Sequence, residues 1–121
     1  MSKEKIEQNV YRHGKVLIQE KGYISPIDLL IKMERVTPKQ VNDWRLKKIP
    51  NIESVTVGNL SKINHILKTL QKFAKEQNLK PSMTIYKSWG KGPKKTLQFS
   101  KKGNAYIEEV YSTHYVGVKP K

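Results

Sequence analysis

The side chains best suited to chemistry in this chain are lysines placed among glycines, in the segment from Trp89 to Lys95. Its sequence, Trp-Gly-Lys-Gly-Pro-Lys-Lys, has two glycines that let backbone N–H groups approach an anion, and three lysines that supply charge. The spacing of a nucleotide-binding P-loop is absent. We expect Lys91, Lys94 and Lys95 to bind phosphate groups. The alternative is a solvated hairpin tip whose lysines protect an exposed edge from aggregation.

Positive charge dominates the whole chain and is densest in its last third. The formal net charge is +14 on 121 residues, and from residue 79 onwards there are nine lysines, no arginine and two acidic residues. Because such self-repulsion does not stabilise a free protein, we expect a polyanionic partner, and nucleic acid is the first candidate. Further C-terminal lysines that we assign to this surface are Lys87, Lys101 and Lys102.

Two aromatic residues, Tyr86 and Trp89, lie close to these lysines in the sequence. Aromatic rings beside a basic groove are typical of proteins that stack the bases of single strands. Both residues are therefore candidate stacking side chains. For Trp89, however, we favour burial in the core, because tryptophan is highly buried on average.

The residues that most enzymes need do not form a recognisable group in this sequence. The histidines, His13, His65 and His114, are far apart, and none has a metal-ligand partner three or four residues away. No acidic residue pairs with them in the sequence. We therefore expect no catalytic residue, metal, cofactor or small-molecule substrate, with a nuclease that uses His114 as the alternative.

Cysteine is absent from the chain, which excludes disulfides and the usual structural zinc sites. The first residues lack the apolar region of a secretory signal. No run approaches the roughly 20 apolar residues that a membrane span requires. These features predict a soluble cytoplasmic protein without a membrane partner, and a basic role at a membrane surface is the weaker alternative.

Helices, two of which begin with recognisable N-cap residues, are the elements expected to position these side chains. Apolar spacing predicts a first helix over residues 3–20. Ser25 and Thr37, each followed by a proline, are N-cap residues for two further helices, and the second of these ends ahead of Pro50. From about residue 58 to 78, apolar residues repeat every three or four positions and predict the longest helix, with lysines on its outer face.

Residues 23–48 contain the two capped helices and a short turn between them. The features of this segment are an Asp-Leu opening at residues 28–29, a central valine, a capped second helix and a Val-x-x-Trp pattern at residues 41–44. In these features the segment resembles a helix-turn-helix of the DNA-binding superfamily. The resemblance implies that the second helix enters the major groove of DNA.

This resemblance also implies roles for side chains of the second helix. Early exposed residues of such a helix approach base edges, and later basic residues contact phosphates. The candidates are Lys39, Gln40 and Asn42 for the bases, and Arg45 and Lys47 for the phosphates. The alternative is a helical hairpin that packs on the longest helix and simply buries Trp44.

The last third of the chain changes from helical spacing to alternation. Residues 83–89 and 96–100 alternate apolar with mostly polar side chains and flank the glycine-rich segment. This pattern predicts a β-hairpin with a lysine-rich tip. Residues 105–116 fit either a helix or a third strand, and we expect a short helix followed by an extended tail.

These elements predict an α+β fold, mainly α. A helical, helix-turn-helix-like module over residues 1–78 carries a basic hairpin and tail over residues 79–121, packed on it as one compact unit. In a winged-helix arrangement the hairpin would contact the DNA backbone beside the second helix. We expect non-catalytic binding of duplex DNA. The alternatives are a protein that binds structured or ribosomal RNA, and a basic interaction module that docks on an acidic partner, with a homodimer as a further option.

Overall fold

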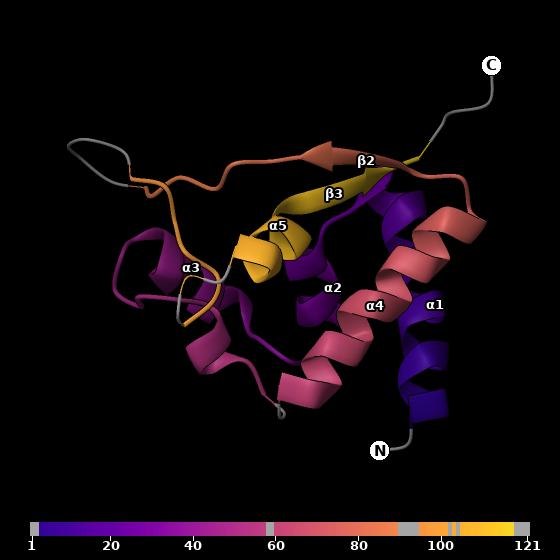
Figure 1. Ribbon diagram of the computed structural model, residues 1–121, viewed down its shortest axis with the longest axis horizontal. Coiled ribbons are helices and arrows are strands. Elements are labelled where there is room, and N and C mark those ends of the chain that lie inside the picture. The colour runs from indigo at the N-terminus through magenta and orange to yellow at the C-terminus, as the bar shows by residue number, and fades with distance from the viewer. Residues whose placement is uncertain (1–2, 58–59, 90–94, 102, 104, 118–121) are drawn as a thin grey trace.

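The computed structural model describes residues 3–57, 60–89, 95–101, 103 and 105–117 (Figure 1). They form mainly helices with a small antiparallel sheet, which confirms the predicted α+β, mainly α, class. The helices are α1 (Lys3–Lys21), α2 (Pro26–Lys32), α3 (Pro38–Arg45), the 3-10 helix η1 (Glu53–Val55), α4 (Leu60–Glu76) and α5 (Ala105–Ser112). The strands are β1 (Tyr23–Ile24), β2 (Lys80–Met83) and β3 (Thr113–Val116). No helix in the described part of the chain is long and apolar enough to cross a membrane.

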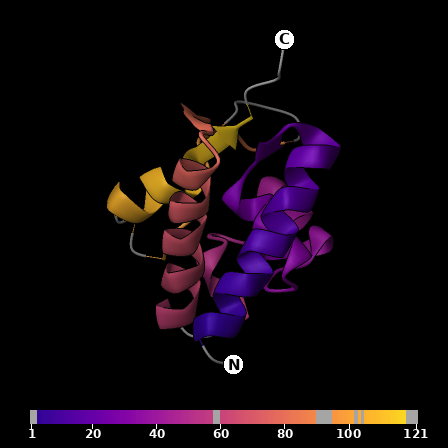
Figure 2. The same ribbon diagram turned by 90° about the vertical axis from the view of Figure 1, so that its right-hand side faces the viewer.

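Helices α1 and α4 pack against each other and form one side of the molecule (Figures 1 and 2). The apolar stripe predicted over residues 58–78 is the buried face of α4. The prediction that this helix is the longest is wrong for the described residues, because α1 has 19 residues and α4 has 17. A glycine brings the two helices close, because a Cβ atom at Gly14 would lie only 2.9 Å from the buried ring of Phe73. Residues that the pair contributes to the core include Ile6, Val10, Leu17, Ile63, Ile66, Leu70 and Phe73.

The two predicted N-caps start α2 and α3. The Ser25 hydroxyl accepts a hydrogen bond from the Asp28 N–H at 3.0 Å. Thr37 and Gln40 form a complete capping box, in which each side chain accepts from the other residue's backbone N–H, at 3.1 and 3.0 Å. Local hydrogen bonds therefore place the start of both helices, as the sequence predicted.

The sheet has the strand order β1-β3-β2, so the C-terminal strand β3 lies in its centre. β3 pairs antiparallel with β1, with Ile24 opposite Tyr115. It also pairs antiparallel with β2, with Met83 opposite Thr113. The predicted short helix and extended tail at the C-terminus are confirmed as α5 followed by β3.

The prediction of two hairpin strands over residues 83–89 and 96–100 is wrong, because Met83 is the only residue of these segments that belongs to a strand in the described part of the chain. β2 instead covers Lys80–Met83, and it pairs with β3 and not with residues 96–100. Two extended arms, residues 86–89 and 95–97, meet at one isolated bridge between Lys87 and Thr96, whereas the predicted tip lies outside the described residues.

Side chains form hydrogen bonds with the backbone groups that a longer second hairpin strand would use for pairing. The indole N–H of Trp44 donates to the Gln98 carbonyl at 2.9 Å. The Glu108 carboxylate accepts from the N–H groups of Phe99 (2.8 Å) and Ser100 (2.6 Å). These three backbone groups therefore have hydrogen-bond partners without a neighbouring strand.

The hydrophobic core combines residues from both parts of the chain. Trp44 of α3 is fully buried and contacts Phe99, with ring centroids 4.9 Å apart. Phe99 in turn stacks on Tyr111 of α5, at 5.2 Å. These aromatic contacts attach α3 and the segment after the arms to the same core.

Candidate nucleic-acid interface

The arms of the predicted hairpin are attached to the C-terminal end of α3. The backbone N–H of Trp89 donates to the carbonyl of Arg45 at 2.7 Å. The Nη1 atom of Arg45 donates to the carbonyl of Lys87, also at 2.7 Å. Two hydrogen bonds therefore join one residue of α3 to one arm, which places the end of the second helix beside the basic segment.

Arg45 itself lies between two aromatic rings. Its guanidinium carbon is 4.8 Å from the ring centroid of Tyr86 and 4.9 Å from that of Trp89. Burial lowers the pKa of Arg45, whereas Tyr86 opposes that shift. Because its guanidinium lies against both rings and donates to the Lys87 carbonyl, Arg45 acts as a clamp between α3 and the arm. Its predicted contact with a phosphate stays a prediction.

The two candidate stacking residues have different environments. Trp89 is 46% exposed, so the favoured expectation that it belongs to the core is wrong. Tyr86 contacts the rings of Trp44 and Phe99, and a 2.8 Å hydrogen bond joins its hydroxyl to Nε2 of His114. Trp89 is therefore the one of the pair whose ring is substantially accessible.

On α3, two of the candidate base contacts already have partners within the helix. The Lys39 ammonium lies 3.0 Å from the Asp43 carboxylate, although the Lys39 side chain is largely exposed. The Oε1 atom of Gln40 is part of the capping box. Asn42 is exposed, as is Lys47 just beyond the helix. Of the candidates, Lys39, Asn42 and Lys47 thus reach solvent most freely.

The arms hold two exposed lysines close to this end of α3. Lys87 and Lys95 lie on opposite arms, and both are exposed. The N–H of Ser88 donates to the Lys95 carbonyl at 2.9 Å, and the Lys95 N–H donates to the Ser88 hydroxyl at 3.0 Å. Other lysines predicted for this surface that lie outside the described residues are Lys91, Lys94 and Lys102.

Lys101 occupies a different environment from the arm lysines. Its side chain is exposed, but its backbone N–H lies 3.4 Å from the carboxylate of Glu53. The preceding residue, Ser100, binds the carboxylate of Glu108. Two acidic side chains near the backbone of Lys101 therefore offset part of its positive charge.

Sequence reasoning missed Lys48 on this surface, the buried Ser88 that links the two arms, and the clamping role of Arg45. The clamp by Arg45 and the link by Ser88 join segments that are separated in the sequence, for which the chain carries no local signal. Lys48 is also exposed and directly follows Lys47. This pair of consecutive lysines could have been recognised from the sequence.

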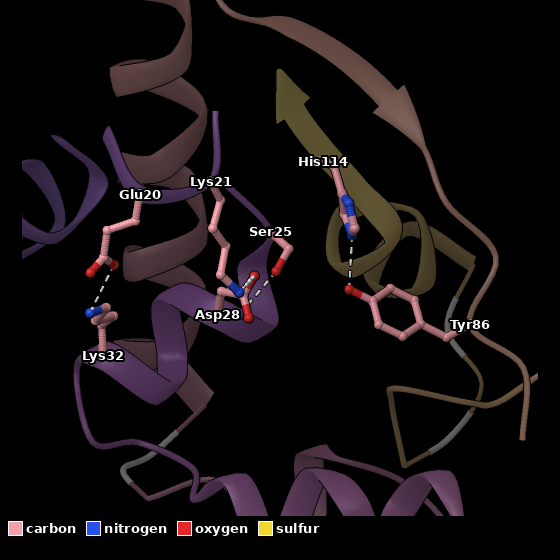
Figure 3. Close-up of polar contacts among 7 residues, drawn as sticks. All are labelled: Glu20, Lys21, Ser25, Asp28, Lys32, Tyr86 and His114. Carbon is pink, nitrogen blue, oxygen red and sulfur yellow. Dashed lines mark hydrogen bonds and ion pairs between the residues drawn. The ribbon is translucent and has the colours of Figure 1, made fainter. Parts of the chain in front are cut away.

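A second polar cluster lies between α2, β3 and the first arm (Figure 3). The ring of His114 stacks on Tyr23 at 5.6 Å, and its Nε2 atom faces the Tyr86 hydroxyl. Lys21 forms an ion pair with Asp28 at 3.1 Å. Burial lowers the pKa of His114 and raises the pKa of Tyr86 to about 12. These shifts favour the neutral form of both rings, so the cluster fits a structural link between β3 and the arm.

Comparison of the chain with protein-family models, with curated proteins and with solved structures finds no match. In the described part of the chain, no group of three or more histidine, aspartate or glutamate residues could hold a metal ion. The charges and contacts around α3 and the arms are therefore the observations from which a function can be inferred.

Proposed function

We propose that this protein binds nucleic acid without catalysing a reaction on it, and that its principal ligand is duplex DNA. The observation that carries the proposal is the attachment of the lysine-bearing arms to the C-terminal end of α3 through Arg45. In a chain with a net charge of +14, the electrostatic attraction to a polyanion is strongest where several cations lie on one surface.

Helix α3 and the arms would have different tasks on DNA. The helix-turn-helix resemblance assigns α3 to the major groove, where the exposed Asn42 would approach base edges. Lys47, Lys87 and Lys95 would contact phosphates on either side of the groove. Because Gln40 serves its capping box and Lys39 faces Asp43, we expect backbone contacts to dominate the affinity and sequence preference to be modest.

Structured RNA is the second candidate, because the same shortage of free base-reading side chains suits recognition by shape and backbone charge. Both ligands agree with the cytoplasmic location expected for a chain without cysteine. Affinities for a DNA duplex and an RNA hairpin of equal length, measured side by side, decide between the two.

The salt dependence of binding tests the proposed surface directly. We expect the affinity for a labelled DNA duplex to fall linearly in a log–log plot against salt. Changing Lys87 and Lys95 together to alanine should reduce the slope by about 0.9 for each phosphate that the protein no longer neutralises. Fluorescence anisotropy at several salt concentrations measures both quantities.

A matched control comes from the outer face of α4. Lys68 and Lys75 are also exposed, so the Lys68→Ala/Lys75→Ala variant has the same net charge as the arm variant. Its slope should stay close to that of the unchanged protein. Equal slopes for the two double variants would remove the arms from the interface, and no binding to DNA or RNA at about 50 mM salt would refute the proposal itself.

A further inference from the structure

The ring of Trp89 is unusual because it is both accessible and held in place. Its backbone N–H is bound to the Arg45 carbonyl, and the guanidinium of Arg45 lies 4.9 Å from its ring centroid. Tyr86 supports the guanidinium from another side, at 4.8 Å. An exposed tryptophan that was merely tolerated at the surface would not need this support.

Trp89 lies beside the lysines of the basic surface. Lys87 lies two residues before it on the same arm, and Lys95 on the other arm is linked through Ser88. Tyr106, in contrast, is 58% exposed on α5 and lines a cavity with Met83 and Val110. Trp89 therefore combines an accessible aromatic ring with adjacent cations, as nucleic-acid stacking platforms do.

We propose that Trp89 is a stacking platform for an unpaired base, and that Arg45 is its positioning residue. Within a closed duplex both faces of each internal base are covered by neighbouring base pairs, so a protein side chain can stack only on a base that has left the helix. Trp89 consequently makes the protein prefer a duplex with an unpaired base over a fully paired one. This inference rests on the proposed nucleic-acid binding and names the form of the ligand.

Preorganisation explains why Arg45 contributes without touching the base. A ring whose orientation is already set loses little conformational freedom when a base stacks on it. The planar guanidinium covers a ring face in a way that the compact ammonium of lysine does not. The Arg45→Lys change should thus weaken the preference for unpaired bases, while keeping the charge.

Binding to two matched DNA duplexes tests the proposal. One is fully paired and the other has the same sequence with a short unpaired bulge in its centre, so that both have the same ends. The unchanged protein should bind the bulged duplex more tightly. Trp89→Ala should lower the affinity for the bulged duplex by about tenfold and leave the fully paired duplex unaffected. Trp89→Phe keeps an aromatic ring and should retain most of the preference.

Tryptophan emission provides a second readout, because the chain has two tryptophans and Trp44 is fully buried. Stacking of a base should quench the emission of Trp89 in the unchanged protein. In Trp89→Phe, the remaining emission of Trp44 should not change on binding. Tyr106→Ala removes an exposed ring that belongs to α5 and not to the arms, and it serves as the matched control for affinity.

The outcomes separate this inference from the proposed function. A preference for the bulged duplex that Trp89→Ala abolishes supports the inference. Equal affinities of the unchanged protein for both duplexes, or a preference that survives in Trp89→Ala, overturns it while leaving nucleic-acid binding intact. No binding to either duplex at low salt refutes the proposed function, and the inference with it.

Discussion

At the scale of single residues, three non-glycine residues in the described part of the chain adopt a left-handed backbone conformation, each two positions after the last residue of a helix. They are Glu34 after α2, Lys47 after α3 and Asn78 after α4, with φ angles of 60°, 66° and 56°. At Glu34 two hydrogen bonds close the helix, from Glu34 N to Ile31 O at 3.0 Å and from Arg35 N to Leu30 O at 2.8 Å. Glycine adopts this geometry without steric cost and asparagine tolerates it, so strain is stored mainly at Glu34 and Lys47.

We expect Glu34→Gly to stabilise the protein. Relief of the left-handed strain is worth about 1–2 kcal/mol, and the greater freedom of glycine in the unfolded chain offsets part of it, so the gain should be about 0.5 kcal/mol. Urea denaturation measures the change in the free energy of unfolding. As a control, Lys72→Gly in the middle of α4 should cost about 1 kcal/mol. A Glu34→Gly variant that is less stable than the parent would contradict the expectation.

Because His114 is partly buried, we expect the protein to lose stability in acid. Its ring lies between Tyr23 and Tyr86, and burial lowers its pKa from the ordinary value of 6.5, although the nearby Asp28 opposes the shift. The unfolded chain then binds a proton more readily than the folded protein does. The stability that His114 contributes is present above pH 6.5 and is lost as the pH falls through the folded-state pKa.

Thermal unfolding between about pH 8 and about pH 5 checks this expectation. The melting temperature should fall towards the acidic end, and His114→Phe should show a shallower decline, because it keeps a ring without a titrating group. His13, whose pKa is also lowered by burial, should account for part of the decline that remains. An unchanged decline in His114→Phe would exclude His114 as its source.

At the scale of elements, the contact between α1 and α4 depends on a residue that lowers helix propensity. Gly14 lies within α1, where alanine would favour the helix by about 1 kcal/mol. A Cβ atom there, however, would approach the buried ring of Phe73 to 2.9 Å. Close packing therefore outweighs local propensity at this position.

Gly14→Ala should consequently destabilise the protein by about 1 kcal/mol, because overpacking costs about 1–3 kcal/mol and the gain in propensity offsets part of it. Chemical denaturation measures the effect. Combining it with Phe73→Leu, which makes room for the methyl group, should show a favourable coupling in a double-mutant cycle. A Gly14→Ala variant that is more stable than the parent would contradict this expectation, because α1 and α4 would then have moved apart at little cost to accept the methyl group.

At the scale of the whole molecule, the net charge of +14 opposes the compact state. The ion pairs that offset it are partly exposed, such as Lys21 with Asp28 and Lys32 with Glu20 (Figure 3). Exposed pairs of this kind contribute at most about 1 kcal/mol each. The charge density is thus retained at some cost in stability, which a polyanionic partner would offset.

Salt and polyanions should therefore stabilise the free protein. Raising the salt concentration screens the repulsion between lysines, so the melting temperature should increase. Heparin, used as a model polyanion, should raise it further at low salt by binding the folded state, whereas neutral dextran should not. Differential scanning fluorimetry measures all three conditions. A melting temperature that does not respond to salt would indicate that the charges do not repel strongly.

The sequence alone determined the features that depend on neighbouring residues. Ser25 and Thr37 start their helices through hydrogen bonds to residues three positions away, and the apolar stripe of α4 follows from helical spacing. At the C-terminus the spacing fitted either a helix or a strand; the favoured short helix and extended tail match α5 and β3, but the pairing of β3 with β1 and β2 was not predicted. Such signals are complete within one or two helical turns of chain.

The tertiary structure decided which candidate side chains are accessible and which are already bound. Trp44 donates to the Gln98 carbonyl across 54 residues, and Arg45 donates to the Lys87 carbonyl across 42. The first contact uses a backbone group that a hairpin strand would need, and the arms meet at one isolated bridge. The second contact attaches the arm to α3, and Trp89 lies exposed on that arm. Each depends on backbone atoms that meet only when distant segments pack on one core, and no local pattern encodes that meeting.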